Sequence, residues 1–169
     1  IHPFLDGNGR LGRLLIVFFL VSAGHLPEPL LYVSSYLDRN KSQYYDRLQA
    51  VRERGEIQEW LQFFFRAVSE QATDAIDRAE QLTDLTKVYR ERLYGSRSRA
   101  HELVDRLAQN PYITSAQAAQ YLEVSGQGAK NLLDQMTAAG ILTPVSRIPG
   151  RAKRWVAIVM LDVLRAEST

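Results

Sequence analysis

Residues 2–13 of this 169-residue chain read His2-Pro3-Phe4-Leu5-Asp6-Gly7-Asn8-Gly9-Arg10-Leu11-Gly12-Arg13. An apolar run follows at once, Leu14-Leu15-Ile16-Val17-Phe18-Phe19-Leu20-Val21, and it predicts a buried helix. The Gly-Asn-Gly turn is therefore expected at a helix N-terminus, where unpaired N–H groups and the positive end of the helix dipole attract phosphate. Arg10 and Arg13 are three residues apart, on one side of the first turn, and both can donate paired hydrogen bonds to phosphate oxygens. The stretch thus predicts a nucleotide phosphate site.

The same residues match the signature HPFx[DE]GN[GK]RxxR at all nine of its specified positions, so the chain resembles the Fic family. Fic proteins mostly transfer AMP from ATP to a hydroxyl side chain of a target protein. The resemblance implies that His2 is the general base for an incoming Tyr, Ser or Thr hydroxyl, and that Asp6 holds Mg²⁺ on the α and β phosphates. It also implies an anion hole formed by Gly7, Asn8 and Gly9. Arg10 would contact the β phosphate, and Arg13 the γ phosphate.

Physical chemistry is consistent with this assignment of roles. Phosphoryl-type transfer needs mainly positioning and charge neutralisation, together with one group that accepts a proton. Histidine suits that last role because its ordinary pKa lies near neutrality. A plainer interpretation of Asp6 is a turn residue that hydrogen-bonds its own backbone. By resemblance, Gly9 favours nucleotidyl transfer, since the Fic branch that phosphorylates its targets carries Lys at this position.

Composition bounds the class of protein. With 46% apolar residues the chain can form one sizeable core or two small ones, and the absence of Cys excludes disulfides and thiolate chemistry. A cytoplasmic location is the natural expectation, and the longest apolar run is too short to span a bilayer. The chain has no Met at position 1, and the resemblance implies further helices and a target-holding flap upstream of His2. We therefore expect little transferase activity from these residues alone.

The predicted fold is mainly α, with residues 1–95 forming the C-terminal part of a Fic-type helical bundle. The first helix is predicted over 11–23, and because it is apolar on nearly all sides it is expected in the middle of that bundle. Asn40 is predicted to cap a second helix that runs through Arg54 and ends at Gly55.

Two adjacent tyrosines on this second helix have two interpretations. Tyr44 and Tyr45 resemble a position where relatives hold the adenosine part of ATP, but tyrosines on an apolar stripe also serve as core. Some relatives carry Asn seven residues further on, where this chain has Arg52.

After the second helix, apolar residues recur at spacings of three and four from Ile57 to Leu93 and predict one long helix. This helix either spans to the next domain or forms a homodimer interface.

Residues 96–169 are predicted to form a second domain that resembles a winged helix. The glycine and serine-rich segment at 95–99 marks the boundary. Thr114 and Gln117 form a capping box before a helix over 115–122, and Ser125 caps a helix that ends near Gly140. Strands are predicted over 141–144 and 154–159, joined by a basic loop as a small hairpin.

Charge alone does not decide what this second domain binds. Residues 97–169 hold nine Lys or Arg against six acids, a net charge of +3, whereas residues 1–96 carry a net charge of −1. Contact with DNA phosphates or with a protein would use four cations in or beside the loop, Arg147, Arg151, Lys153 and Arg154. The exposed start of the 125–139 helix offers three residues for base contacts, Gln127, Lys130 and Asn131. This set is small for direct base recognition, so the sequence favours protein docking over DNA.

The leading hypothesis is an adenylyltransferase that uses ATP and Mg²⁺, with the winged helix docking the target protein. The alternative is a DNA-binding transcriptional regulator in which the Fic loop senses nucleotide. A third hypothesis is a catalytically silent helical body.

Overall fold

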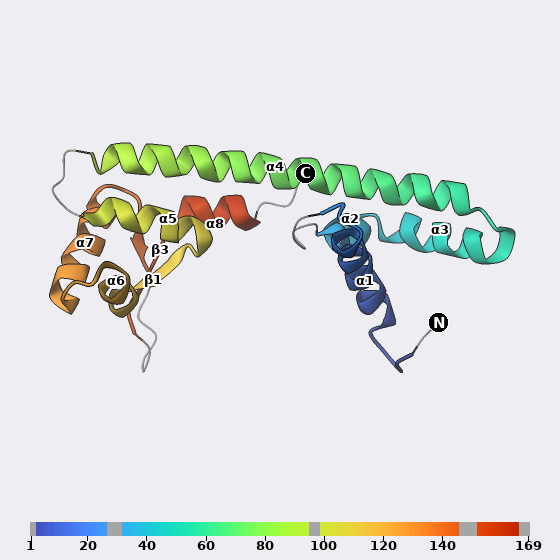
Figure 1. The fold of residues 1–169 in the computed structure, drawn as a ribbon, viewed down its shortest axis with the longest axis horizontal. Helices are drawn as coiled ribbons and strands as arrows, with labels where there is room; N and C mark the ends of the chain where they lie inside the picture. Colours follow the sequence, from blue (N-terminus) through green and yellow to red (C-terminus); the bar gives the residue numbers. More distant parts are fainter. Residues whose placement is uncertain (1–2, 27–31, 95–98, 146–151, 166–169) are drawn as a thin grey trace. The chain divides into compact units, whose positions relative to one another are not determined.

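The computed structural model describes residues 3–26, 32–94, 99–145 and 152–165. These residues are mainly helical, with a small three-stranded antiparallel sheet. The chain divides into two compact units, residues 1–77 and 78–169, which share the long helix α4 (Ile57–Arg92). Figure 1 shows the elements of each unit along the part of α4 that belongs to it. The assignment of separate roles to residues 1–95 and 96–169 stays a prediction.

The first unit packs three helices with the first part of α4: α1 (Asn8–Ser22), α2 (Val33–Arg39) and α3 (Lys41–Arg54). Its core joins α2 to α4, through Val33, Tyr36, Leu37, Phe63 and Ala67. The Tyr36 and Phe63 rings lie 5.6 Å apart between centroids. An aromatic pair of this kind stabilises the packing of α2 on α4 by more than the buried area alone would.

The helix α1 forms where its sequence predicts but is not buried within the described residues. Val17 is its one buried residue, whereas Leu14, Leu15, Phe18 and Phe19 are each about half exposed or more. The expectation of a fully surrounded helix is therefore wrong for the residues that the structure describes. An apolar sequence on all sides predicts burial, but the described elements do not cover every side of α1. The helix also begins three residues earlier than predicted, at Asn8.

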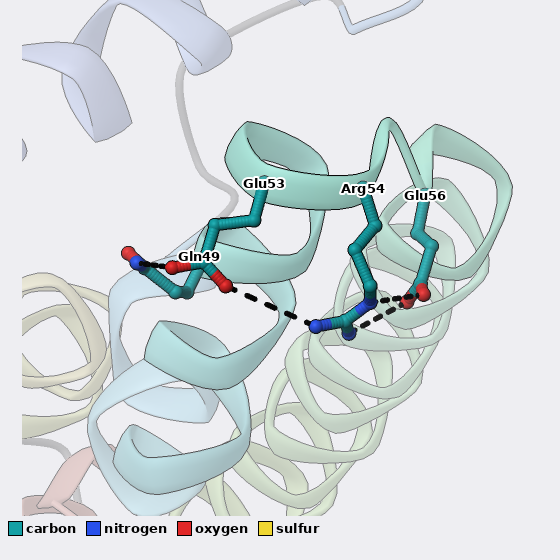
Figure 2. Close-up of polar contacts among 4 residues, drawn as sticks. All are labelled: Gln49, Glu53, Arg54 and Glu56. Atoms are coloured by element: carbon teal, nitrogen blue, oxygen red, sulfur yellow. Dashed lines mark hydrogen bonds and ion pairs between the residues drawn. The ribbon is translucent and has the colours of Figure 1, made fainter.

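Helices α3 and α4 meet at a tight turn held by a chain of polar contacts (Figure 2). Gly55 ends α3 in the left-handed conformation, with φ of 70°, as the sequence predicts. The Gln49 amide donates to Glu53, and the Arg54 guanidinium donates to both carboxylate oxygens of Glu56, with one Nη2 to Oε2 distance of 3.1 Å. These hydrogen bonds from Arg54 hold the pKa of Glu56 below its usual value.

The start of α3 differs from its prediction in one detail. Asn40 precedes the helix, but its side chain makes no cap. Instead its Nδ2 donates to the Tyr36 carbonyl at 2.9 Å, so it closes the C-terminus of α2. Its backbone carbonyl accepts from the Tyr44 N–H at 2.9 Å, so Asn40 serves the beginning of α3 through its backbone and the end of α2 through its side chain.

The second unit surrounds one core with the short helices η1 (Arg99–His101), α5 (Glu102–Gln109), α6 (Ser115–Leu122), α7 (Gly126–Ala138) and α8 (Ile158–Arg165). The predicted capping box is confirmed, since Thr114 accepts from the Gln117 backbone and the Gln117 side chain accepts from the Thr114 backbone. Ser125 caps α7 by accepting from the Gly128 N–H at 3.1 Å. Tyr89, in the last turns of α4, and Leu93, just after the helix, also enter this core.

The sheet has the order β1-β3-β2, with β1 (Tyr112–Thr114) and β2 (Thr143–Pro144) both antiparallel to β3 (Arg154–Val156). The two predicted strands are shorter than expected, and β1 was not predicted. The prediction of a strand through Val159 is wrong, because Ile158 begins α8 and Met160 turns into the core. In the part of the chain that the structure describes, no helix is long and apolar enough to cross a bilayer.

Candidate functional site

The predicted phosphate loop, which is the part of residues 2–13 that the structure describes, bends sharply into α1 at Gly7. This residue is the N-cap and has φ of 82° and ψ of 2°, a left-handed conformation that favours glycine. Its carbonyl accepts the first helical hydrogen bond, from the Leu11 N–H at 3.0 Å, and no side chain caps the helix. The backbone N–H groups of the first turn, at Asn8, Gly9 and Arg10, are therefore available to an anion.

The Asn8 side chain holds the preceding loop. Its Oδ1 accepts from the Phe4 N–H at 3.1 Å, and its Nδ2 donates to the Phe4 carbonyl at 2.7 Å. This two-way contact fixes residues 4–8 as a compact turn. The backbone N–H of Asn8 and the second N–H of its side-chain amide can still contribute to an anion hole.

Asp6 and Arg10 face each other across this turn. Arg10 Nη2 lies 3.5 Å from Asp6 Oδ2, and the two side chains are 76% and 95% exposed. An ion pair this long and this exposed adds little to stability. Both groups therefore remain accessible to a ligand that carries negative phosphates and a cation.

Arg13 lies one turn further along α1 and is held more firmly. Its Nε donates to Ser34 Oγ on α2 at 3.1 Å, in a partly buried contact. A Cβ placed on Gly9 would lie 3.5 Å from Arg13 Nη1, so this nitrogen lies next to the backbone of the first turn. Sequence analysis did not find Ser34, because nothing local relates two residues 21 positions apart.

The loop and α3 line one open cavity of about 1020 Å³. The first wall carries the predicted phosphate-binding residues, Asp6, Gly7, Asn8, Gly9, Arg10 and Arg13. The second carries both predicted tyrosines and four further residues of α3, Tyr44, Tyr45, Asp46, Leu48, Gln49 and Arg52. Residues separated by more than 30 positions in the sequence are thereby gathered around one space of a size suited to a nucleotide.

The two tyrosines differ in their surroundings. Tyr44 packs toward the core, with its ring 5.7 Å from that of Trp60, whereas the Tyr45 side chain is 55% exposed. Their own rings lie 5.2 Å apart at 55°. Tyr44 is therefore largely a core residue, whereas Tyr45 presents an aromatic surface to the cavity. Contact of either tyrosine with the adenosine part of ATP stays a prediction.

A divalent cation fits this site through carboxylates, since Asp6 and Asp46 both line the cavity. Mg²⁺ is commonly held by one or two carboxylates together with substrate phosphates and waters. Asp6 offers one exposed carboxylate beside the anion-binding turn. Among the described ranges no group of three or more His, Cys, Asp or Glu could hold a metal ion.

The predicted contact residues of the second unit are only partly within the described ranges. Arg147 and Arg151 lie outside them, as does His2, the predicted general base of the first unit. Lys153 lies over the Trp155 ring, with its ammonium 4.7 Å from the centroid, and Arg154 lies 5.9 Å from the Tyr112 centroid.

On α7, Gln127 Nε2 donates to Asn131 Oδ1 at 2.9 Å. Two of the three side chains predicted to contact bases are therefore hydrogen-bonded to each other. Lys130 is exposed on the same helix. The described surface of α7 is consequently poor in side chains that are free to recognise bases.

Comparisons with known proteins agree with the motif. Residues 1–20 match the model of the Fic/DOC family. Two relatives, each named "Protein adenylyltransferase Fic", come from Aedes aegypti and Culex quinquefasciatus and are 40% identical over 63 residues, which is 37% of this chain. A protein of the same name from Drosophila grimshawi is also 40% identical over 63 residues. The chain spans only about a tenth of the length of these relatives, 11% to 12%. Together the matches support a Fic family protein.

Proposed function

We propose that this Fic family chain carries the nucleotide site of a protein adenylyltransferase, which transfers AMP from ATP to a Tyr, Ser or Thr hydroxyl of a target protein. The observation that carries the proposal is the single cavity lined by the phosphate loop on one wall and by Tyr45 on the other. An anion-binding helix N-terminus, two guanidinium groups and an aromatic surface are the groups needed to bind a nucleoside triphosphate.

In this proposal the first turn of α1 binds the phosphates. Backbone N–H groups at residues 8–10 meet the phosphate oxygens, Arg10 contacts the β phosphate, and Arg13 contacts the γ phosphate. Tyr44 and Tyr45 lie on the adenosine side. Bound with the nucleotide, Mg²⁺ would be held by Asp6 and would neutralise charge on the α and β phosphates.

The transfer itself is one displacement. The target hydroxyl oxygen forms a bond to the α phosphorus of ATP, the bond from that phosphorus to the bridging oxygen of the β phosphate breaks, and pyrophosphate leaves. His2 accepts the hydroxyl proton as general base. The chain's remaining contribution is to hold the triphosphate in line and to stabilise its charge through the α1 N-terminus and the two arginines.

Replacing His2 tests whether this residue accepts the proton while other residues bind the phosphates. In the full natural protein that contains this chain, His2→Ala should abolish AMP transfer while ATP binding survives, because the proposed base accepts a proton but holds no phosphate. Calorimetry and a transfer assay on the same variant measure both properties. Transfer close to the wild-type rate would contradict the assignment of the base.

The second unit is proposed to be a winged helix that docks the target protein. The small antiparallel sheet beside α6 and α7 and the cations at Lys153 and Arg154 support a surface of this kind. DNA binding by a transcriptional regulator is the weaker alternative, because Gln127 and Asn131 bond to each other. A homodimer through α4 stays a prediction.

A further inference from the structure

The two arginines of the phosphate loop are held in opposite ways. Arg10 is exposed, and its contact with Asp6 is long, at 3.5 Å. Arg13 is half-buried, and its Nε donates to Ser34 Oγ at 3.1 Å, a normal hydrogen-bond distance. Before any ligand binds, one guanidinium is therefore free to reorient and the other is fixed.

Ser34 is itself held by the core of the first unit. It lies in α2, where Val33, Tyr36 and Leu37 are 4%, 6% and 2% exposed. These side chains pack with Phe63 and Ala67 of α4. A hydroxyl on a helix anchored in this way is a fixed acceptor, whereas a loop acceptor would move with the loop.

The contact also determines the direction of the guanidinium. This group is planar, so a hydrogen bond at Nε sets the plane in which its two terminal nitrogens lie. Nη1 then lies beside Gly9, within the first turn that would bind the phosphates. The fork of Arg13 is therefore presented to the anion site on the side opposite Ser34.

We propose that Ser34 is a positioning residue, which holds Arg13 in the orientation that binds the terminal phosphate of a nucleoside triphosphate. The inference rests on the proposed function. Ser34 acts through Arg13 and does not touch the nucleotide itself. Because an arginine side chain otherwise loses conformational freedom when it binds, a preoriented guanidinium gives tighter binding from the same contact.

Nucleotide titrations on the full natural protein that contains this chain test the consequence. Ser34→Ala should weaken ATP binding by about threefold to tenfold, the cost of ordering one long side chain on binding, and should leave ADP binding nearly unchanged. Ser34→Thr keeps the hydroxyl, so this variant should bind ATP with the wild-type affinity. Ser35→Ala is the matched control on the same helix and should change neither affinity. Equal losses for ATP and ADP in Ser34→Ala, or no rescue by Thr, would contradict positioning.

Arg13→Ala separates failure of this inference from failure of the proposed function. If Arg13 binds the terminal phosphate, its loss should weaken ATP more than ADP, and Ser34→Ala added to it should have no further effect. An Arg13→Ala variant that binds both nucleotides normally, or a wild-type chain that binds neither, would contradict the proposed function. A normal Arg13 effect with additive Ser34 and Arg13 losses would contradict only the role of Ser34.

A measurement without nucleotide tests the contact directly. The Nε–H proton of Arg13 should exchange slowly with solvent in the wild type, by nuclear magnetic resonance of ¹⁵N-labelled arginine, and should exchange faster in Ser34→Ala. The exposed Arg10 is the internal control and should be unaffected. Equal exchange of the Arg13 proton in both proteins would overturn the inference.

Discussion

Gly7 and Gly12 are a matched pair of glycines in and beside α1. Gly7 has φ of 82°, whereas Gly12 is helical and an added Cβ there would meet nothing within 4 Å. Gly7→Ala should lower the free energy of unfolding by about 1 to 2 kcal/mol, because an L residue is strained in the left-handed region. Gly12→Ala should raise it by up to about 1 kcal/mol through better helix propensity. Urea denaturation of the two variants checks the difference in sign, and a loss of similar size in both would contradict the described turn.

Asp6 provides a second test with single-residue changes. Asp6→Asn should leave the free energy of unfolding within about 0.5 kcal/mol of the wild type, since its contact with Arg10 is long and exposed. The increase in ATP affinity on adding Mg²⁺ should nevertheless disappear, because the carboxylate is the proposed ligand. Titrations with and without Mg²⁺ measure this increase. If it persists at full size in Asp6→Asn, Asp6 is only a turn residue.

At the scale of elements, the start of α6 depends on its capping box. Thr114→Ala should destabilise the second unit by about 1 kcal/mol, because a backbone N–H of the first turn loses its acceptor. Thr83 is the control, since its hydroxyl only bonds back to the Ala79 carbonyl within α4. Thermal unfolding of both variants checks this prediction. A larger loss for Thr83→Ala would contradict it.

The turn between α3 and α4 predicts a pH effect. Hydrogen bonds from Arg54 lower the pKa of Glu56, so the carboxylate contributes stability above its unfolded-state pKa and loses that contribution as the pH falls through its folded-state pKa. Arg54→Ala should return the pKa of Glu56 toward the ordinary glutamate value. A carboxyl titration followed by nuclear magnetic resonance measures it. An unchanged pKa would mean that the contacts in Figure 2 do not persist in solution.

The elements that could be predicted from sequence are those with local signals. Gly55 ends α3, the Thr114 box begins α6, and Ser125 caps α7, each through contacts within a few residues. Elements set by tertiary contacts were missed: β1 exists because it pairs with β3, and α8 replaces a predicted strand because Met160 packs into the core. The same limit applies to the site, where the motif predicts the loop but not Ser34, which α2 brings to it.

At the scale of the whole molecule, the four cations of the predicted basic loop distinguish a docking surface from a DNA-binding surface. In the full natural protein, a variant with Ser at all four positions, Arg147, Arg151, Lys153 and Arg154, should lose modification of its target but keep weak, unspecific binding to duplex DNA. The control Arg66→Ser replaces an exposed cation of α4 in the first unit and should keep both. If DNA binding were the function, the fourfold variant would instead lose most of its affinity, and the slope of log affinity against log salt would fall by about 0.9 per lost phosphate contact.

AMP transfer is proposed at the cavity between the phosphate loop and α3. The most direct measurement incubates the full natural protein with target proteins, Mg²⁺ and ATP labelled either on the α phosphate or on the γ phosphate. Proposed AMP transfer predicts protein-bound label from α-labelled ATP only, and none when His2 is replaced by Ala. Protein-bound label from γ-labelled ATP alone, or equal α labelling in the His2→Ala variant, would contradict it.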